Sequence, residues 1–193
     1  MDLRINQVEF RPVEHEYWYT EGNKHFQLHG VTSAICKLLG KNFPDTEEVQ
    51  VATIYGHDVH SESEMWIKEG RLPSTKAGQW LIDYLKNFKE SNNVVRYEAE
   101  LKVSDFIGTA SCIDIVALLP DDKAVLFDIK TTATFNREYC SLQLSVYKRL
   151  YEMNYDRNVT GLFVLGTKSQ RAFRIIEQPM SKVEKILGMN KVI

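Results

Sequence analysis

The chain has 193 residues, of which 44% are hydrophobic, and its formal net charge is −2. This length and composition allow a sizeable core, so one compact domain is the simplest organisation. No stretch is long and apolar enough to span a membrane, and the first residues lack a signal-peptide pattern, so we expect an intracellular, cytoplasmic protein without a membrane partner. Its three cysteines, Cys36, Cys112 and Cys140, are odd in number and widely separated, which argues against a zinc site or an iron–sulfur cluster.

The first quarter of the chain favours short strands. Residues 5–20 and 24–28 are rich in aromatic and β-branched side chains and flank a Glu-Gly-Asn turn, so they predict a strand pair. Residues 32–39 favour a short helix that stops at a glycine. We therefore expect a β-rich extension over residues 1–45, ahead of the main core over residues 46–193.

Two longer helices are predicted next. The first covers residues 47–69 and ends at Gly70, and it carries His60 and Glu64 four residues apart on one face. The second covers residues 75–90, because apolar side chains recur there at helical spacing. That apolar stripe is expected to face the core.

A strand is predicted over residues 94–103. Alternation places Glu98, Glu100 and Lys102 on one face of this strand and apolar side chains on the other. Two acidic side chains therefore stand near the strand that follows.

An antiparallel hairpin is predicted from residues 111–119 and 124–130, two apolar runs that flank a Pro-Asp-Asp turn. If the turn centres on Asp121, the numbers of paired residues add up to 242, which places Asp114 opposite Asp128. Side chains directly opposed in this way have Cβ atoms roughly 4.5–5.5 Å apart.

Two opposed aspartates would repel each other unless a cation lay between them. Alternation adds Lys130 to the face of Asp128 and turns Ile129 into the core. Two carboxylates beside an ammonium group suit Mg²⁺ or Mn²⁺, which prefer oxygen ligands and retain several waters. The hairpin therefore predicts a site for one or two divalent ions.

A helix over residues 136–153 is expected to pack on the sheet through Leu142, Val146 and Leu150. Gln143 and Tyr147 are one turn apart on an adjacent stripe, so they point in the same direction. The predicted elements that close the chain are strands over residues 162–165 and 172–176 and a short helix over residues 181–187.

Taken in order, these motifs resemble the PD-(D/E)XK nuclease superfamily, and within it the RecB-like and phage-type exonucleases. The residues that carry the resemblance are Gly56-His57-Asp58-Val59-His60, Asp114, Asp128-Ile129-Lys130 and Gln143-Leu144-Ser145-Val146-Tyr147. The chain departs from the family at Ser111, where many members have the glycine of a G-x-x-D motif.

The resemblance implies an α/β fold with a restriction-endonuclease-like core, in which helices flank a central mixed β-sheet. It also implies metal ligands: Asp114, Asp128 and the backbone carbonyl of Ile129, completed by His60 and a glutamate. Glu98 and Glu100 both fit the glutamate, and we favour Glu98 slightly. Lys130, Gln143 and Tyr147 would belong to the catalytic group, with Lys130 acting on the attacking water or on the developing charge.

The function implied is a Mg²⁺- or Mn²⁺-dependent DNA exonuclease in phage-type recombination, replication or repair, and a phage or prophage origin fits this role. Two alternatives remain, an endonuclease of the same fold and a non-catalytic member that binds nucleic acid or protein. A homo-oligomer or a recombination-protein partner is compatible with the family.

The net charge of −2 is a mild argument against a nucleic-acid partner, because DNA binding requires cations that neutralise phosphates. A nuclease can concentrate its cations beside an acidic site, so we expect a local basic patch. The candidates for it are Arg96, Lys102, Arg137, Lys148, Arg149, Lys168 and Arg171.

Overall fold

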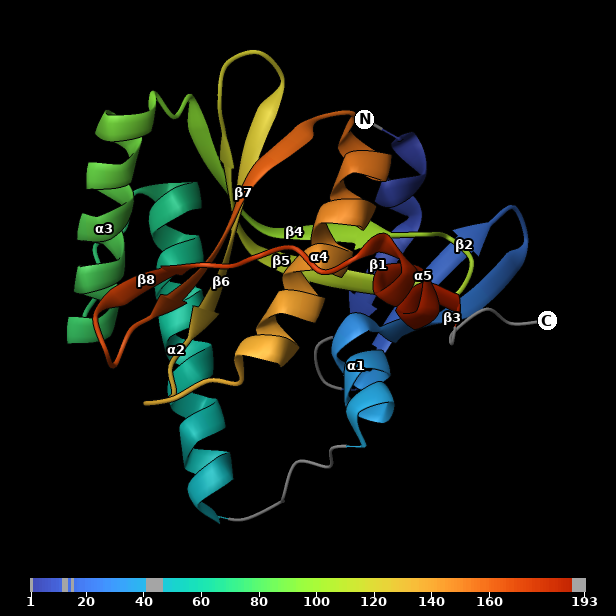
Figure 1. Cartoon of the computed structure of the whole chain (residues 1–193), viewed down its shortest axis with the longest axis horizontal. Helices are drawn as coiled ribbons and strands as arrows, with labels where there is room; N and C mark the ends of the chain where they lie inside the picture. Colours follow the sequence, from blue (N-terminus) through green and yellow to red (C-terminus); the bar gives the residue numbers. More distant parts are fainter. Residues whose placement is uncertain (1, 12–13, 15, 41–46, 189–193) are drawn as a thin grey trace.

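The computed structural model describes residues 2–11, 14, 16–40 and 47–188. They form an α/β fold with a central mixed sheet of eight strands flanked by helices, as expected from the sequence (Figure 1). The boundary expected between residues 45 and 46 lies outside the described residues. Among the described residues, no helix is both long enough and apolar enough to cross a membrane.

The sheet has the strand order β1-β2-β3-β5-β6-β7-β8, with β4 paired to β5 beside this path. The β3/β5 and β6/β7 pairs are parallel and the other pairs are antiparallel. The strands are β1 (Val8–Arg11), β2 (Glu16–Glu21), β3 (Lys24–Gly30), β4 (Arg96–Ser104), β5 (Thr109–Leu118), β6 (Lys123–Lys130), β7 (Asn158–Gly166) and β8 (Arg171–Arg174).

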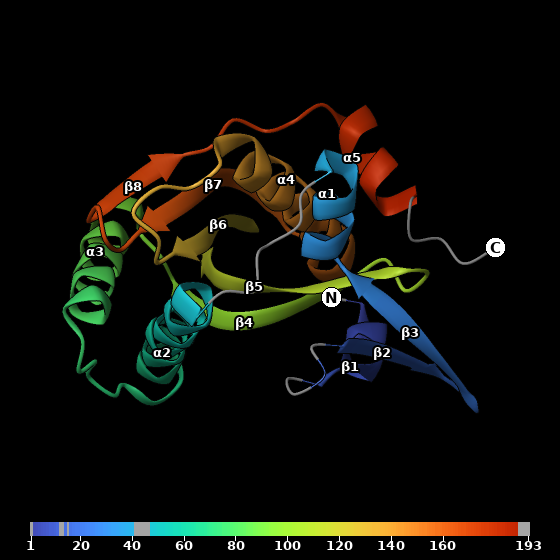
Figure 2. The same ribbon diagram turned by 90° about the horizontal axis from the view of Figure 1, so that it is seen from below.

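Helices cover both faces of the sheet, which Figure 2 shows edge-on. One face packs against α1, α4 and α5, and the other against α2 and α3. The helices are α1 (Val31–Leu39), α2 (Glu47–Glu69), α3 (Lys76–Asn92), α4 (Arg137–Tyr155) and α5 (Met180–Gly188).

The first strand prediction needs correction, because residues 5–20 do not form one strand. Leu3–Gln7 form a 3-10 helix, and β1 and β2 then form a hairpin in which Val8 pairs with Tyr19. Asp2 caps the 3-10 helix by accepting a hydrogen bond from the amide of Arg4. A local capping interaction therefore overrides the strand preference of this segment.

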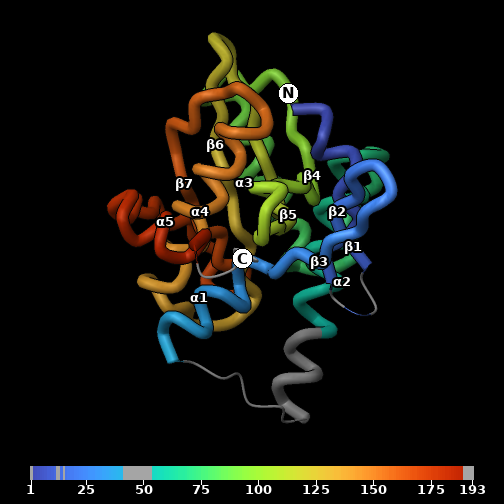
Figure 3. The backbone as a smooth tube through the Cα atoms, turned by 90° about the vertical axis from the view of Figure 1, so that its right-hand side faces the viewer, coloured from blue at the N-terminus to red at the C-terminus, as the bar shows by residue number. Residues whose placement is uncertain are grey.

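The N-terminal strands join the main sheet directly. His29 and Gly30 of β3 pair with Thr109 and Ala110 of β5, and α1 packs on the α4 side of the core. The tube in Figure 3 shows β1, β2 and β3 running beside β4 and β5. Through β3 and α1, the described part of the chain before residue 41 is thus packed against the strands that carry the candidate site.

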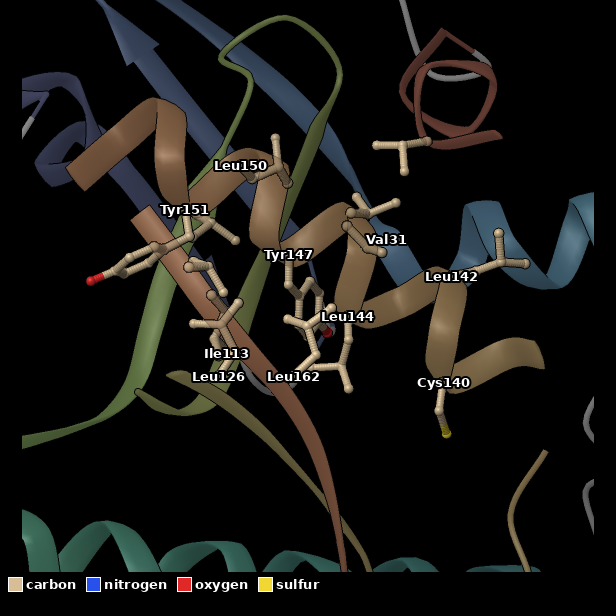
Figure 4. Close-up of a cluster of buried hydrophobic side chains, with 14 of the residues drawn as sticks. Val31, Ile113, Leu126, Cys140, Leu142, Leu144, Tyr147, Leu150, Tyr151 and Leu162 are labelled. Carbon is tan, nitrogen blue, oxygen red and sulfur yellow. The ribbon is translucent and has the colours of Figure 1, made fainter. Parts of the chain in front are cut away.

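The larger core lies between α4 and the sheet. Figure 4 shows Leu142, Leu144, Tyr147 and Leu150 of α4 gathered with side chains of the sheet and of α1. Asn136 caps α4 by accepting from the amide of Tyr139, which fixes where the helix begins. This start places Gln143 and Tyr147 on the side of α4 that faces the sheet.

The core on the opposite face is centred on aromatic rings. Phe127 is fully buried and lies 5.1 Å from Phe88 and 5.6 Å from Phe163 between ring centroids. Because Phe127 immediately precedes Asp128, this packing also fixes the strand that carries the candidate ligands.

We predict that Phe127→Ala lowers the free energy of unfolding by about 3–5 kcal/mol, the usual cost of deleting a buried aromatic side chain. Urea unfolding measures the loss. Leu72→Ala is the control, because Leu72 is 71% exposed and its removal should change stability by less than about 0.5 kcal/mol. Equal unfolding midpoints for the two variants would contradict this account of the core.

Candidate metal centre

Asp114 and Asp128 come together where β5 and β6 separate. The paired residues run from Leu118 with Ala124 to Ile115 with Phe127, so the predicted register is confirmed. One residue further along, the Asp114 side chain crosses to β6, where Oδ2 accepts the backbone amide of Ile129 at 2.6 Å. Ile129 is buried in the core on the side of α2 and α3, as predicted.

The hairpin turn that sets this register depends on two aspartates. Asp121 and Asp122 both have positive φ, at 58° and 53°, a conformation that aspartate adopts more readily than most residues. The amide of Lys123 donates to the carbonyl of Pro120 across the turn. The turn chemistry therefore determines which residues face each other at the far end of the hairpin.

Lys130 is held between a strand and a helix. Its Nζ donates to Asp128 Oδ1 at 3.0 Å and to Gln143 Oε1 at 3.3 Å. Asp128 Oδ2 lies 2.8 Å from the same nitrogen, yet no donor among the described residues has hydrogen-bonding geometry toward it. Since Asp128 is only 1% exposed, one of its carboxylate oxygens retains free acceptor capacity inside the protein.

A short chain of hydrogen bonds positions Gln143. Its Nε2 donates to the Tyr147 hydroxyl at 2.9 Å, and Ser111 Oγ of β5 donates to the same hydroxyl at 3.0 Å. Gln143 and Tyr147 are both buried. The amide is thereby oriented with its oxygen toward Lys130.

His60 reaches the centre from α2. Its Nδ1 lies 3.7 Å from Asp114 Oδ1 and 3.8 Å from Glu100 Oε1. Ligand atoms of these three residues all lie within 4.8 Å of one another, close enough to share one metal ion. Gly56, one turn earlier, allows this approach, because a Cβ there would lie 3.1 Å from Thr131 Oγ1.

The position of Glu98 does not support its selection as the glutamate ligand. Its Oε1 accepts from Arg96 at 2.7 Å, and its charge acts on Tyr151 and Tyr155 of α4. Glu100 takes the place beside His60 instead. The sequence allowed both glutamates, and the geometry favours Glu100.

The expectation that Glu98, Glu100 and Lys102 share one face fails because alternation breaks at Glu100. This residue has φ 50°, in the left-handed region, which costs on the order of 1–2 kcal/mol for a residue with a side chain. Tyr97 packs on the α2/α3 side, whereas Leu101 packs on the α4 side. The two side chains would lie on one face of a regular strand, so β4 changes face at Glu100.

Strand β5 changes face at the matching position. Ile113 and Val116 both pack on the α4 side, and Ile115 between them packs on the α2/α3 side. Side chains on one face of a regular strand are an even number of residues apart, but Ile113 and Val116 are three apart, and Asp114 lies between them. Both strands therefore pass from one core to the other at the two residues that bring carboxylates to the centre.

The electrostatics of the group reflect an excess of negative charge. Burial raises the pKa of Asp128 to about 6, against the lowering effect of Lys130, and the charge of Asp114 adds to the rise. Burial also raises the pKa of Asp114, against His60, with Glu100 adding to the rise. Three carboxylates thus face two cationic groups, and a divalent cation would relieve the repulsion between them.

The pKa values of the two cationic groups are also raised, which for these groups favours the charged form. Burial alone would lower the pKa of His60, but Asp114 and Glu100 raise it to about 9. Burial likewise opposes the charge of Lys130, and the carboxylates of Asp128 and Asp114 nevertheless raise its pKa. The neighbouring carboxylates therefore favour the protonated form of both side chains.

Two residues outside the recognised motifs support the centre. Ser111 holds Tyr147, and its position three residues before Asp114, where the resemblance expects glycine, was the only sequence signal for it. Thr131 lies against Gly56 of α2. No feature of the sequence pointed to Thr131.

No protein-family model and no curated protein matches the chain. A candidate exonuclease from Eubacterium rectale has a similar structure, with a TM-score of 0.42 and 10% identity over 84% of this chain and 76% of that one. The protein SSO0001 has a TM-score of 0.40 and 15% identity over 88% of this chain and 75% of that one. Likenesses at this level assign neither a family nor an activity to the chain.

We predict that Asp114→Asn stabilises the metal-free protein by about 1 kcal/mol at pH 8, because it removes a half-buried charge beside other carboxylates. The folded-state pKa of Asp114 is raised, so its penalty is present at high pH and disappears as pH falls and the carboxyl takes up a proton. The gain should therefore shrink between pH 8 and pH 5, as measured by urea unfolding in EDTA.

Asp121→Asn is the matched control, because the Asp121 side chain is 80% exposed at the hairpin turn. It should leave stability nearly unchanged at both pH values. A loss of stability in Asp114→Asn at pH 8 would show that the Asp114 charge is satisfied without a metal ion.

Proposed function

We propose that the protein is a divalent-metal-dependent nuclease of the PD-(D/E)XK superfamily, with a restriction-endonuclease-like core, and that it acts as a DNA exonuclease. The observation that carries the proposal is the Asp128 carboxylate, which is buried with one oxygen lacking a hydrogen-bond donor and lies beside Lys130. A buried carboxylate left in this state is costly unless a cation completes its surroundings.

The donor set fits Mg²⁺ or Mn²⁺, which favour carboxylate oxygens. Asp114, Glu100 and Asp128 would hold the metal together with the carbonyl of Ile129, and His60 would complete the group through nitrogen or through a water. Such an ion supplies Lewis acidity toward a phosphoryl oxygen and acidifies water for attack on phosphorus.

The protein side chains supply positioning and charge. The two aspartates beside Lys130 raise its pKa and favour its protonated form, so it would donate to a phosphate oxygen or to the attacking water and neutralise charge that develops in the transition state. Gln143 would hold the ammonium in that direction, because its oxygen accepts from Nζ while its nitrogen is fixed by Tyr147.

We predict that Lys130→Ala and Asp128→Ala each reduce DNA cleavage by about 10²-fold or more, the usual effect of removing a group that stabilises transition-state charge. Release of nucleotides from linear single- and double-stranded DNA, with Mg²⁺ or Mn²⁺ present, measures this. Lys123→Ala is the control, since Lys123 begins the same strand and is exposed.

Wild-type protein that cleaves neither substrate with either metal would contradict the proposal. A closed circular DNA tests the mode of action, because an exonuclease requires a free end. Cleavage of the circle would identify an endonuclease instead.

The choice between the two glutamates gives a second test. We predict that Glu100→Gln raises the metal concentration needed for half-maximal cleavage by about tenfold or more, and that Glu98→Gln leaves it unchanged. Titration of Mn²⁺ by calorimetry should show the same difference between the variants. The reverse ranking would restore Glu98 as the ligand.

A further inference from the structure

Several exposed cations lie together beside the candidate metal centre. Arg137 begins α4, and Lys168 and Arg171 lie in and just after the turn from β7 to β8; all three are exposed. The two segments 131–137 and 166–174 contain four basic residues, these three and Arg174, and no acidic residue, although the whole chain has a net charge of −2. We call Arg137, Lys168 and Arg171 the β8 basic patch.

The strand register measures how near this patch is to the centre. Lys130 of β6 pairs with Gly166 of β7, and Gly166 pairs with Arg171 of β8. Neighbouring strands are about 4.8 Å apart, so the backbone of Arg171 lies about 10 Å from that of Lys130. The loop before α4 and the β7–β8 turn also lie side by side in Figures 1 and 2.

Arg171 of the patch faces the same side of the sheet as the catalytic candidates. Phe173 packs on the α4 side and its neighbour Ala172 on the α2/α3 side, so alternation turns Arg171 toward α4. Asp128 and Lys130 share this face, because Lys130 contacts Gln143 of α4.

Aromatic packing holds the Arg137 guanidinium in place. Its Cζ lies 5.7 Å from the centre of the Phe173 ring, and Phe135 packs edge-on against that ring at 5.1 Å. Gly166 leaves room for the arrangement, since a Cβ there would lie 3.3 Å from Phe173 Cε2. A guanidinium stacked in this way loses less side-chain freedom when it binds an anion.

Three of the other four candidate cations are already engaged. Arg96 contacts Glu98, Lys148 contacts Glu177, and Lys102 donates to the carbonyl of Val8. Arg137, Lys168 and Arg171 form no ion pair with any residue that the structure describes. They are therefore available to a polyanion.

We infer that the β8 basic patch is a phosphate-binding track, which carries a nucleic-acid strand from the metal centre across β7 and β8. This inference rests on the proposed nuclease function, because it takes the scissile phosphate to lie at that centre. Each strand of a duplex presents one charge per about 3.4 Å of axis, so about 10 Å corresponds to roughly three phosphates. The track would hold the substrate a few nucleotides from the bond that is cut.

The test measures binding separately from cleavage. Fluorescence anisotropy of labelled single- and double-stranded oligonucleotides is recorded in EDTA between 50 and 200 mM salt, using the full chain. The double variant Arg137→Ala/Arg171→Ala should bind at least about tenfold more weakly, and its slope of log K against log salt should fall by about one for each cation removed.

Arg149→Ala is the matched control. Arg149 is an exposed arginine of the same helix, twelve residues from Arg137 and hence about 18 Å along the helix axis, and its removal should change neither affinity nor slope. The double replacement Arg137→Lys/Arg171→Lys should keep the salt slope, because it conserves charge. Unfolding midpoints of all variants should agree, since the altered side chains are exposed.

Each failure has its own signature. An unchanged salt slope in the double alanine variant, an equal loss in Arg149→Ala, or no binding by the unaltered protein would overturn the track. If the unaltered protein cuts DNA but the double alanine variant binds normally, the nuclease proposal stands and the track falls. If the predicted binding losses appear without any cleavage by the unaltered protein, the β8 basic patch binds nucleic acid but the nuclease proposal falls, and with it the path to a scissile phosphate.

Discussion

The repulsion among Glu100, Asp114 and Asp128 is the constraint on which the centre depends. A hairpin register, a break in strand alternation and two packed cores hold these carboxylates together against it. Lys130 and His60 offset part of the charge and leave one carboxylate oxygen of Asp128 without a donor. Holding these like charges together costs stability, which is typical of sites organised to bind a ligand.

Features that depend on local chemistry could be predicted from the sequence. The Pro-Asp-Asp turn fixed the facing of Asp114 and Asp128, because hairpin register follows from the turn. Helical spacing likewise placed Gln143 and Tyr147 on one side of α4, and the structure joins them by a hydrogen bond. Asp114 and Asp128 are 14 positions apart and Gln143 and Tyr147 only four, so each of these predictions used residues close together in the sequence.

The choice of glutamate could not be predicted in this way. Alternation assumes an extended backbone throughout a strand, and Glu100 violates it with a left-handed conformation that tertiary packing supports. The role of Ser111 was hidden for a similar reason, since its partner Tyr147 lies 36 residues away. Sorting the basic residues also required the fold, because only the fold shows which cations already have acidic partners.

The change of face in β4 and β5 places the candidate metal centre at the boundary between two cores. Residues on one side of the boundary belong to the layer of α4, and those on the other side belong to the layer of α2 and α3. His60 comes from one layer, and Gln143, which holds Lys130, comes from the other. Partial opening of either layer therefore dismantles the centre, so a ligand bound there would slow amide hydrogen exchange in both layers at once.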